Sequence, residues 1–226
     1  AGNAVAHALR RVRRAGGAAL RTLPPGSSLH RLVARLPPLR SAVRPGAMQR
    51  MQSRDAGRDG THGAALRFGG AVSYESAARR LVTTYKDRGE RRLAGTMAAL
   101  MAPYVAPGWR DGLQAVTFVP ATPAARRRRG FDHAELLAQA VAEELGIACI
   151  DVLRRPHSFD QRRLSRAARL ANMEGSMQAL PGATLPRSVL LVDDVCTTGA
   201  TLFAASEALR EAGAACVRCL TFARAW

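Results

Sequence analysis

Two adjacent carboxylates, Asp193 and Asp194, stand at the end of a short apolar run and directly before a threonine-rich turn, in the stretch VLLVDDVCTTGATL, residues 189–202. Neighbouring carboxylates repel each other and resist desolvation, so a strand end that carries both needs hydroxyls, a cation or water to satisfy them. In the turn, Gly199 permits a tight backbone path, and free amides at the start of the next helix can face an anion. These residues together predict a site for a phosphate and a sugar diol.

The flanking residues predict the elements that hold this site. Residues 189–192 form a continuous apolar run, too short for a helix and typical of a central parallel strand that is covered on both faces. A helix is predicted from about 200 to 212, with Leu202, Ser206 and Leu209 on its packed face and Gly213 as its stop. Ligands of open α/β sheets bind at the carboxyl ends of strands, which favours a binding site here over an acidic turn that only caps a helix.

The core Asp-Asp-x-x-Thr-Thr-Gly, residues 193–199, resembles the phosphoribosyl pyrophosphate loop of type I phosphoribosyltransferases. Upstream, FVPATPAARRRRGFDHAELLAQAVAEELG (118–146) and LRRPHSFDQRRLSRAARLANMEGSM (153–177) are similar to segments of ComF-type proteins, in the same order. The approach SYESAARRLVTTYKDRGERRLA (73–94) extends the likeness, and its Ala77, Leu81, Val82 and Tyr85 have the spacing of one helical face. The sequence therefore resembles the ComF family over most of its length from residue 73 onward.

Three departures from that family stand out. ComF-type proteins often begin with a cysteine-rich zinc module, whereas residues 1–148 contain no cysteine. The usual Asn-Gln after Arg-Gly-Phe is Asp132-His133 in this chain, and Thr122 stands where a second proline often lies. These changes bear on substrate preference more than on the fold.

The resemblance implies that the chain binds phosphoribosyl pyrophosphate with Mg²⁺ and transfers ribose 5-phosphate to a nucleobase-like nitrogen acceptor. It implies that Asp193 and Asp194 are the catalytic carboxylates and hold the metal, in part through its water. It assigns the 5-phosphate to the loop residues Thr197, Thr198, Gly199, Ala200 and Thr201. It places Lys86, Arg129 and Gly130 on the side of the leaving pyrophosphate. The alternative is a noncatalytic ligand sensor, or a component that handles single-stranded DNA during DNA uptake by the competence machinery.

Several of these residues also have simpler interpretations. Lys86 is the only lysine beside 33 arginines, and its compact ammonium suits a phosphate, but a surface lysine kept by chance is the alternative. The arginines 126–129 lie in a predicted loop, 120–130, and could form a nucleic-acid patch or a solvated basic surface. His133 is interpreted as a surface or capping residue, with a general base as the other hypothesis.

The charge of +17 is concentrated at the N-terminus, because residues 1–54 contain eleven arginines and no acidic residue. We predict that residues 1–65 form a disordered Arg/Ala/Pro-rich arm and that 66–226 form the phosphoribosyltransferase-like domain. The arm also resembles a transit peptide or the product of a misplaced start, and it could bind nucleic acid.

The predicted fold is α/β, with a mainly parallel sheet built from residues 115–119, 147–152, 188–193 and 215–222 and flanked by helices. A small hood is predicted from 66–105, and a mobile cover from 154–177. The four cysteines suggest neither a disulfide framework nor a zinc site, and Cys216 and Cys219 are interpreted as buried thiols of a strand. The lack of a disulfide framework fits a reducing, cytoplasmic location, which we expect. No apolar run is long enough for a membrane span. Assembly as a homodimer is left open.

Overall fold

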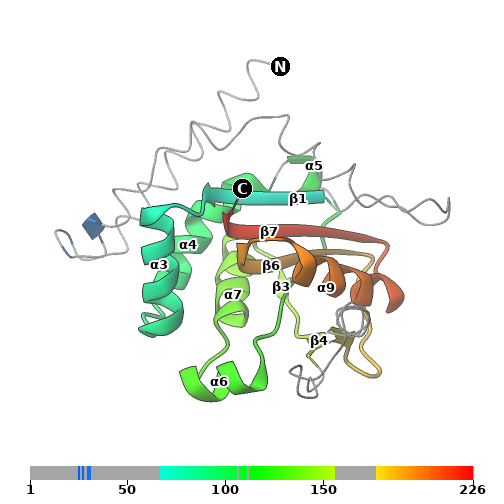
Figure 1. Cartoon of the computed structure of the whole chain (residues 1–226). Helices are drawn as coiled ribbons and strands as arrows, with labels where there is room; N and C mark the ends of the chain where they lie inside the picture. The colour runs from blue at the N-terminus through cyan, green and yellow to red at the C-terminus, as the bar shows by residue number, and fades with distance from the viewer. Residues whose placement is uncertain are drawn as a thin grey trace.

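The computed structural model describes residues 67–105, 107–110, 112–155 and 177–225, together with residues 25, 27, 30 and 31 (Figure 1). Nearly all of the predicted arm, 1–65, lies outside the described residues, and so does most of the predicted cover, 154–177. Among the described helices, none combines the length and the apolar character that a membrane span requires.

An open five-stranded parallel sheet forms the centre of the molecule (Figure 1). Its strands in spatial order are β1 (Arg67–Ser73), β7 (Cys216–Arg224), β6 (Ser188–Cys196), β2 (Ala115–Phe118) and β3 (Ala148–Cys149). Each neighbouring pair is parallel. The central position of β6, between β7 and β2, explains why its residues 189–192 are all apolar and buried.

The order of the strands reverses between β2 and β6. From β2 the chain passes outward to β3, returns to β6 on the other side of β2, and continues outward to β7. In open α/β sheets the crevice at the carboxyl ends of the strands beside such a reversal is where ligands bind. The carboxyl ends of β2 and β6 meet at this point.

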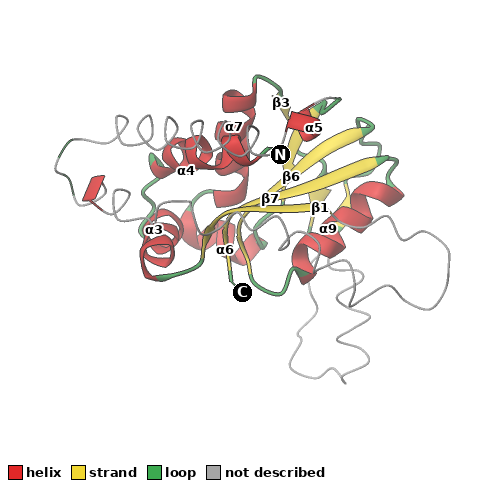
Figure 2. Ribbon diagram, turned by 90° about the horizontal axis from the view of Figure 1, so that it is seen from above, coloured by secondary structure: helices red, strands yellow, loops and turns green. Residues whose placement is uncertain are grey.

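Helices cover both faces of the sheet (Figure 2). On one face lie α4 (Leu93–Met101) and α7 (His133–Leu145), and on the other lies α9 (Ala200–Glu211). The other described elements are α3 (Ser76–Asp87), η2 (Ala102–Tyr104), α5 (Pro107–Arg110), α6 (Pro123–Arg129) and the antiparallel pair β4 (Leu153–Arg154) and β5 (Gln178–Ala179).

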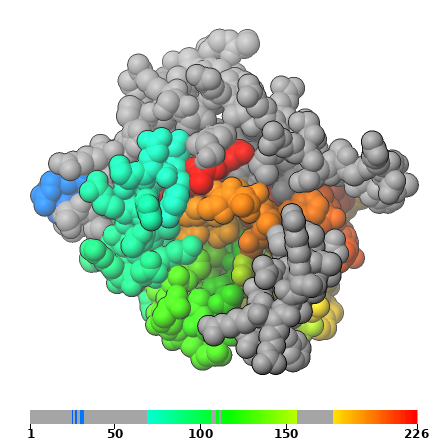
Figure 3. Space-filling model, viewed as in Figure 1, coloured from blue at the N-terminus to red at the C-terminus, as the bar shows by residue number. Residues whose placement is uncertain are grey.

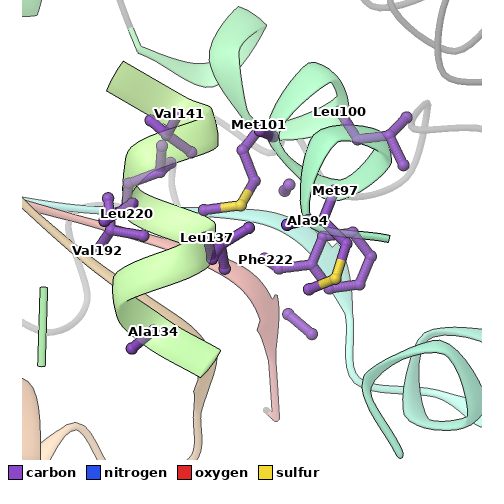
Figure 4. Close-up of a cluster of buried hydrophobic side chains, with 14 of the residues drawn as sticks. Ala94, Met97, Leu100, Met101, Ala134, Leu137, Val141, Val192, Leu220 and Phe222 are labelled. Atoms are coloured by element: carbon purple, nitrogen blue, oxygen red, sulfur yellow. The ribbon is translucent and has the colours of Figure 1, made fainter. Parts of the chain in front are cut away.

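The main core lies between α4, α7 and the sheet. Figure 4 shows Met101 of α4 beside Leu137 of α7, and Met97 of α4 at the ring of Phe222 of the sheet. Side chains alternate along β6, so that residues 190 and 192 join this core while 189 and 191 pack under α9. The same alternation directs residue 194 toward the face of α7.

Two predicted helical patterns are confirmed. The helix predicted from about 200 to 212 is α9, Ala200–Glu211, and Gly213 beyond it has a φ of 106°. The pattern around residues 77–85 is the buried face of α3, which includes Leu81, Val82 and Tyr85.

The predicted hood at 66–105 needs correction, because residues 67–73 form the edge strand β1 and α4 belongs to the core. The sequence RFGGAVS does not have the pattern that predicts a strand, because two glycines interrupt any alternation of apolar residues. A Cβ atom on Gly69 would lie 3.4 Å from Leu220 and 3.5 Å from Trp109. Glycine is therefore suited to this close packing, although it weakens the strand signal.

Three predicted boundaries also differ. β3 contains only Ala148–Cys149 of the predicted 147–152, β6 runs to Cys196 rather than 193, and β7 runs to Arg224 rather than 222. The predicted loop 120–130 contains the helix α6. Thr122 starts this helix, because its side-chain Oγ1 accepts a hydrogen bond of 3.2 Å from the backbone of Ala125, and Pro123 follows in the first turn.

Candidate functional site

Asp193 and Asp194 lie on the part of β6 that extends beyond β2. The last residue of β2, Phe118, pairs with Val192, whereas on its other side β6 remains paired with β7 as far as Cys196. In the described part of the chain, one edge of the strand therefore has no ladder partner at the two carboxylates. In addition, the Oδ1 atom of Asp193 accepts a 2.8 Å hydrogen bond from the backbone N–H of Asp194. Both carboxylates therefore lie inside β6, which continues to Cys196, and not at the last residues of the strand as the sequence predicted.

Asp194 is a buried carboxylate with a lysine as counter-ion. The Nζ atom of Lys86 donates to its Oδ1 over 2.8 Å and lies 2.7 Å from Oδ2, while the side chain of Asp194 is only 2% exposed. Oδ2 has the charge of the ammonium beside it, but no donor among the described residues is aligned for a hydrogen bond to it. The only lysine of the chain thus neutralises the most buried carboxylate of this site.

His133 is buried beside the same carboxylate, and its interpretation as a surface or capping residue is wrong. The residue is 7% exposed, and its Nε2 lies 3.7 Å from Oδ2 of Asp194. Burial lowers the pKa of its ring, against a smaller opposing effect of Asp194. Its Nδ1 lies 3.3 Å from Nη1 of Arg129, whose Nη2 donates to Asp87 over 3.3 Å.

Aromatic contacts fix α3 against the start of α7. The hydroxyl of Tyr85 donates a 2.6 Å hydrogen bond to the backbone carbonyl of His133, and its ring meets Phe131 edge to face. The guanidinium of Arg91 lies 4.7 Å from the centre of the Phe131 ring. These contacts hold Lys86, the next residue of α3, within reach of β6. In Figure 3 the surface of the segment from β6 to α9, in orange, lies between that of α3 and that of α6 and α7.

Asp132 is the N-cap of α7 and also fastens the loop after β2. Its Oδ1 accepts hydrogen bonds from the amides of Ala134 (3.0 Å) and Glu135 (3.4 Å), and its Oδ2 accepts one of 2.7 Å from Ala121. One side chain thus joins the carboxyl end of β2 to the helix that carries His133. This explains the departure of Asp132 from the family pattern by its structural role.

We expect Asp132→Ala to lower the free energy of unfolding by about 2 kcal/mol, because it removes an N-cap and leaves the amide of Ala121 without its acceptor. Urea denaturation checks this value. Asp132→Asn is the matched control, since its single carbonyl oxygen can cap the helix but cannot also reach Ala121, and it should lose less. Equal losses in the two variants would contradict the double role.

The electrostatic environment of the Asp193 carboxyl group differs from that of Asp194. Burial, and next the charge of Asp194, raise the pKa of Asp193, against the opposing attraction of Lys86. Its side chain keeps partial contact with solvent, which moderates this rise. Asp193 therefore gains from any ligand that supplies a hydrogen-bond donor or a cation.

Because the folded-state pKa of Asp193 lies above its unfolded value, the protonated form favours the fold and the ionised form opposes it. The stabilisation by protonated Asp193 is fully present below about pH 4, and it is lost as the pH rises through the folded-state pKa of Asp193. We expect Asp193→Asn to become progressively more stable than the wild type as the pH rises from about 4 to 8. Urea denaturation of both proteins across this range measures the difference, and a constant difference would refute it.

The predicted phosphate loop leads directly into α9. Gly199 has a φ of 80° and is the residue before the first turn of the helix, while Thr197 and Thr198 are exposed. The Oγ1 atom of Thr198 accepts a 3.4 Å hydrogen bond from the amide of Ala200. First-turn amides have no acceptor within a helix, so they and the threonine hydroxyls can bind an anion.

The three residues predicted on the pyrophosphate side do not share one environment. Lys86 faces Asp194, and Arg129 faces His133 and Asp87 with its side chain 14% exposed. Gly130 ends α6 in the left-handed conformation, with a φ of 75°, and is exposed. Only Lys86 therefore contacts the carboxylate pair directly.

Arg155 is an additional charged group of the site. Burial lowers the pKa of Arg155, and the attraction of Asp193 and then of Asp132 partly offsets this lowering. Its Nε is buried without a hydrogen-bond partner among the described residues. Sequence reasoning placed Arg155 only within the predicted cover, 154–177, because nothing in a linear pattern relates it to β6.

One set of side chains in the described ranges has the composition of a metal site. Ligand atoms of His133, Asp193 and Asp194 all lie within 4.8 Å of one another. Two carboxylates are typical of Mg²⁺, which retains several of its waters. An imidazole would instead favour a transition metal.

Residues 132–225 match the family model of the phosphoribosyl transferase domain. This range contains β6, both carboxylates and the loop before α9. Residues 132–225 are thus similar to this family over somewhat less than half of the chain, and they include the centre of the five-stranded parallel sheet.

Among curated proteins, the chain is 36% identical over 116 residues to competence protein F of Haemophilus influenzae. The aligned residues make up 50% of this chain and 51% of that protein. It is 32% identical over 106 residues to competence protein ComFC of Streptococcus pneumoniae, and these residues make up 47% of this chain and 46% of that protein. The chain is thus a distant homologue of both. The matches span about half the length of each of these relatives.

One solved structure, of the allosteric regulatory enzyme of purine biosynthesis, is similar over 58% of this chain and 25% of that chain. The sequence identity is 24% and the TM-score is 0.39. A likeness of this degree says nothing of activity or ligand.

Proposed function

We propose that this protein binds phosphoribosyl pyrophosphate with Mg²⁺ and transfers ribose 5-phosphate to a nitrogen of a nucleobase-like acceptor, with release of pyrophosphate. One observation carries the proposal. The pair Asp193 and Asp194 lies on the part of β6 that extends beyond β2, and the threonine-glycine turn before α9 begins three residues after Asp194. This arrangement offers acceptors for a sugar diol beside donors for a phosphate.

The carboxylates serve the ribose and the loop serves the phosphate in this proposal. Asp193 and Asp194 accept hydrogen bonds from the ribose hydroxyls and stabilise the positive charge that develops at the anomeric carbon. The 5-phosphate is held by amides and hydroxyls of the loop, aided by the positive end of the α9 dipole. The loop residues in this role are Thr197, Thr198, Gly199, Ala200 and Thr201.

Lys86 and Gly130 act on the side of the leaving pyrophosphate. The ammonium of Lys86 has three donors and is 24% exposed, so it can contact an anion as well as Asp194. The exposed backbone of Gly130 allows close approach of a ligand. Arg129 was predicted in the same role, but its contacts with Asp87 and His133 favour a supporting one.

The residues of the site also fit Mg²⁺. The Oδ2 atom of Asp194 is buried without an aligned hydrogen bond, and carboxylate oxygens are ligands that Mg²⁺ prefers. Asp193 and Asp194 would hold the ion, in part through its water. When bound, Mg²⁺ neutralises charge on the leaving pyrophosphate.

Pyrophosphate release tests the transfer. The wild-type protein is incubated with phosphoribosyl pyrophosphate, Mg²⁺ and a panel of purine and pyrimidine bases, with a no-base reaction as the control. We expect release that depends on one class of base and on Mg²⁺. Binding of phosphoribosyl pyrophosphate without release for any base would instead favour a ligand sensor.

A second candidate function, the handling of single-stranded DNA during DNA uptake, rests on the exposed arginines of α6 and of the turn after α3. Arg127, Arg128 and Arg88 are exposed, and the names of two relatives refer to competence. Phosphate contacts of this kind weaken steeply with salt. If DNA binds here, Arg127→Ser/Arg128→Ser should weaken binding of a labelled oligonucleotide and reduce the salt dependence. Unchanged binding would exclude this surface.

A further inference from the structure

An arginine in the turn after α3 lies on an aromatic ring just before α7. The guanidinium of Arg91 is 4.7 Å from the centre of the Phe131 ring, which attracts the cation. Phe131 in turn meets the fully buried Tyr85 edge to face. The amide of Arg91 also donates a 2.8 Å hydrogen bond to the carbonyl of Gly89, which fixes its backbone. The guanidinium therefore has a defined place, although Arg91 is exposed.

No carboxylate within the described ranges forms an ion pair with Arg91. The neighbouring Glu90 accepts hydrogen bonds of 2.9 and 3.3 Å from Arg92, and Asp87 accepts one of 3.3 Å from Arg129. Each of these two carboxylates thus already has an arginine as its partner. The contact of Arg91 with the ring supplies no oxygen acceptor for the five N–H donors of a guanidinium. Its donors are therefore available to an anion.

The space beside this guanidinium is open and lies over Gly130. Among the described residues, a Cβ atom on Gly130 would meet one atom within 4 Å, the Nη2 atom of Arg91 at 3.9 Å. Gly130 is exposed and has a φ of 75°, a conformation that favours glycine. A ligand can therefore reach the backbone at Gly130 and meet Nη2 of Arg91 there.

This open position adjoins the site of the two carboxylates. Phe131 shortly precedes His133, whose Nε2 lies 3.7 Å from Oδ2 of Asp194. Lys86, at the end of α3, lies 2.7 Å from the same oxygen and is 24% exposed. Arg91 follows in the turn after this helix. The end of α3 and the turn beyond it thus bring two cations to the region around the start of α7.

We propose that Arg91 binds the leaving pyrophosphate of phosphoribosyl pyrophosphate, beside Lys86 and the backbone at Gly130. A guanidinium suits this anion, because it can donate two parallel hydrogen bonds to one phosphate group. Phe131 is a positioning residue, since its ring holds the guanidinium in place. The inference rests on the proposed function, which supplies the anion. It gives the role predicted for Arg129 to a residue that the sequence alone did not single out.

Three ligands separate a contact with pyrophosphate from other effects. Phosphoribosyl pyrophosphate, pyrophosphate and ribose 5-phosphate are each titrated calorimetrically into the full chain with Mg²⁺. We expect Arg91→Met to weaken the binding of the first two about tenfold, as for the loss of a hydrogen bond between charged groups. Binding of ribose 5-phosphate should stay within about twofold of the wild type. Arg92→Met is the matched control, because the exposed Arg92 pairs with Glu90, and it should keep all three affinities.

A double-mutant cycle tests the role of the ring. Phe131→Leu keeps an apolar side chain but removes the ring, so it should weaken pyrophosphate binding about threefold. Arg91→Met/Phe131→Leu should bind pyrophosphate no more weakly than Arg91→Met alone, because the ring acts only through the guanidinium. Arg91→Lys should regain part of the affinity, since an ammonium keeps the charge but not the planar fork.

Thermal unfolding of each variant controls for stability, because a purely structural role would lower the melting temperature and the affinities for all three ligands together. Such a joint loss in Arg91→Met would overturn the inference. Equal binding of pyrophosphate and of phosphoribosyl pyrophosphate by Arg91→Met and the wild type would overturn it as well, while the proposed function would stand. If the wild type binds no phosphoribosyl pyrophosphate, the proposed function has failed. The titrations with pyrophosphate then still decide whether Arg91 binds this anion.

Discussion

Replacing Asp193 and Asp194 together by asparagine is expected to weaken the binding of phosphoribosyl pyrophosphate with Mg²⁺ at least a hundredfold. Each carboxylate is proposed to accept a hydrogen bond from a ribose hydroxyl, and hydrogen bonds to charged groups contribute about 1.5 to 3 kcal/mol each. The change also removes both negative charges that hold the metal. Two such losses convert to a factor of at least a hundred in the dissociation constant.

Ligand-induced stabilisation measures this effect. A ligand that binds only the folded protein raises its melting temperature, and the rise grows with the logarithm of the ratio of free ligand to the dissociation constant. We expect a Mg²⁺-dependent rise for the wild type and none for the double variant at the same ligand concentration. Arg127→Ser, on the exposed face of α6, is the control that should keep the rise. A rise in the double variant equal to that of the wild type would contradict the site.

Replacing Lys86 by methionine is expected to lower the free energy of unfolding by about 3 kcal/mol, because it leaves a buried carboxylate without its counter-ion. Asp194 is only 2% exposed and lies 2.7 Å from the ammonium. For a chain of this size, such a loss lowers the melting temperature by roughly 6 to 12 °C.

A double-mutant cycle separates the ion pair from other effects of Lys86. Lys86→Met/Asp194→Asn should regain most of the lost stability, with a coupling of about 2 kcal/mol or more. Lys86→Arg is the matched control for charge, and it should recover only part, since a planar guanidinium does not replace a compact ammonium. Additive effects of the single changes would show that the two side chains do not depend on each other.

The sequence predicted the elements whose patterns are strong and local. The apolar run of β6, the helix α9 with Gly213 after it and the buried face of α3 are all present. β1 was missed because Gly69 and Gly70 disrupt the alternation that identifies a strand. α6 was predicted as a loop because four consecutive arginines carry no helical periodicity, and the cap from Thr122 is a weak signal.

The candidate site was predictable where its residues are consecutive. The carboxylate pair and the threonine loop are parts of one motif, and Lys86 was singled out because it is the only lysine. The ion pair of Lys86 with Asp194 and the burial of His133 depend on how α3 and α7 pack against β6. Such contacts join residues distant in sequence, and the alternation of Leu190, Val192 and Asp194 was the only sequence signal of the face on which they meet.

Calorimetric titration of the wild-type protein with phosphoribosyl pyrophosphate, in the presence and absence of Mg²⁺, tests the central claim most directly. The account predicts a saturable heat with one site per chain in the presence of Mg²⁺, and its loss in Asp193→Asn/Asp194→Asn. A wild-type protein that gives no heat of binding at any Mg²⁺ concentration, while its thermal unfolding shows that it is folded, would contradict the assignment of this site.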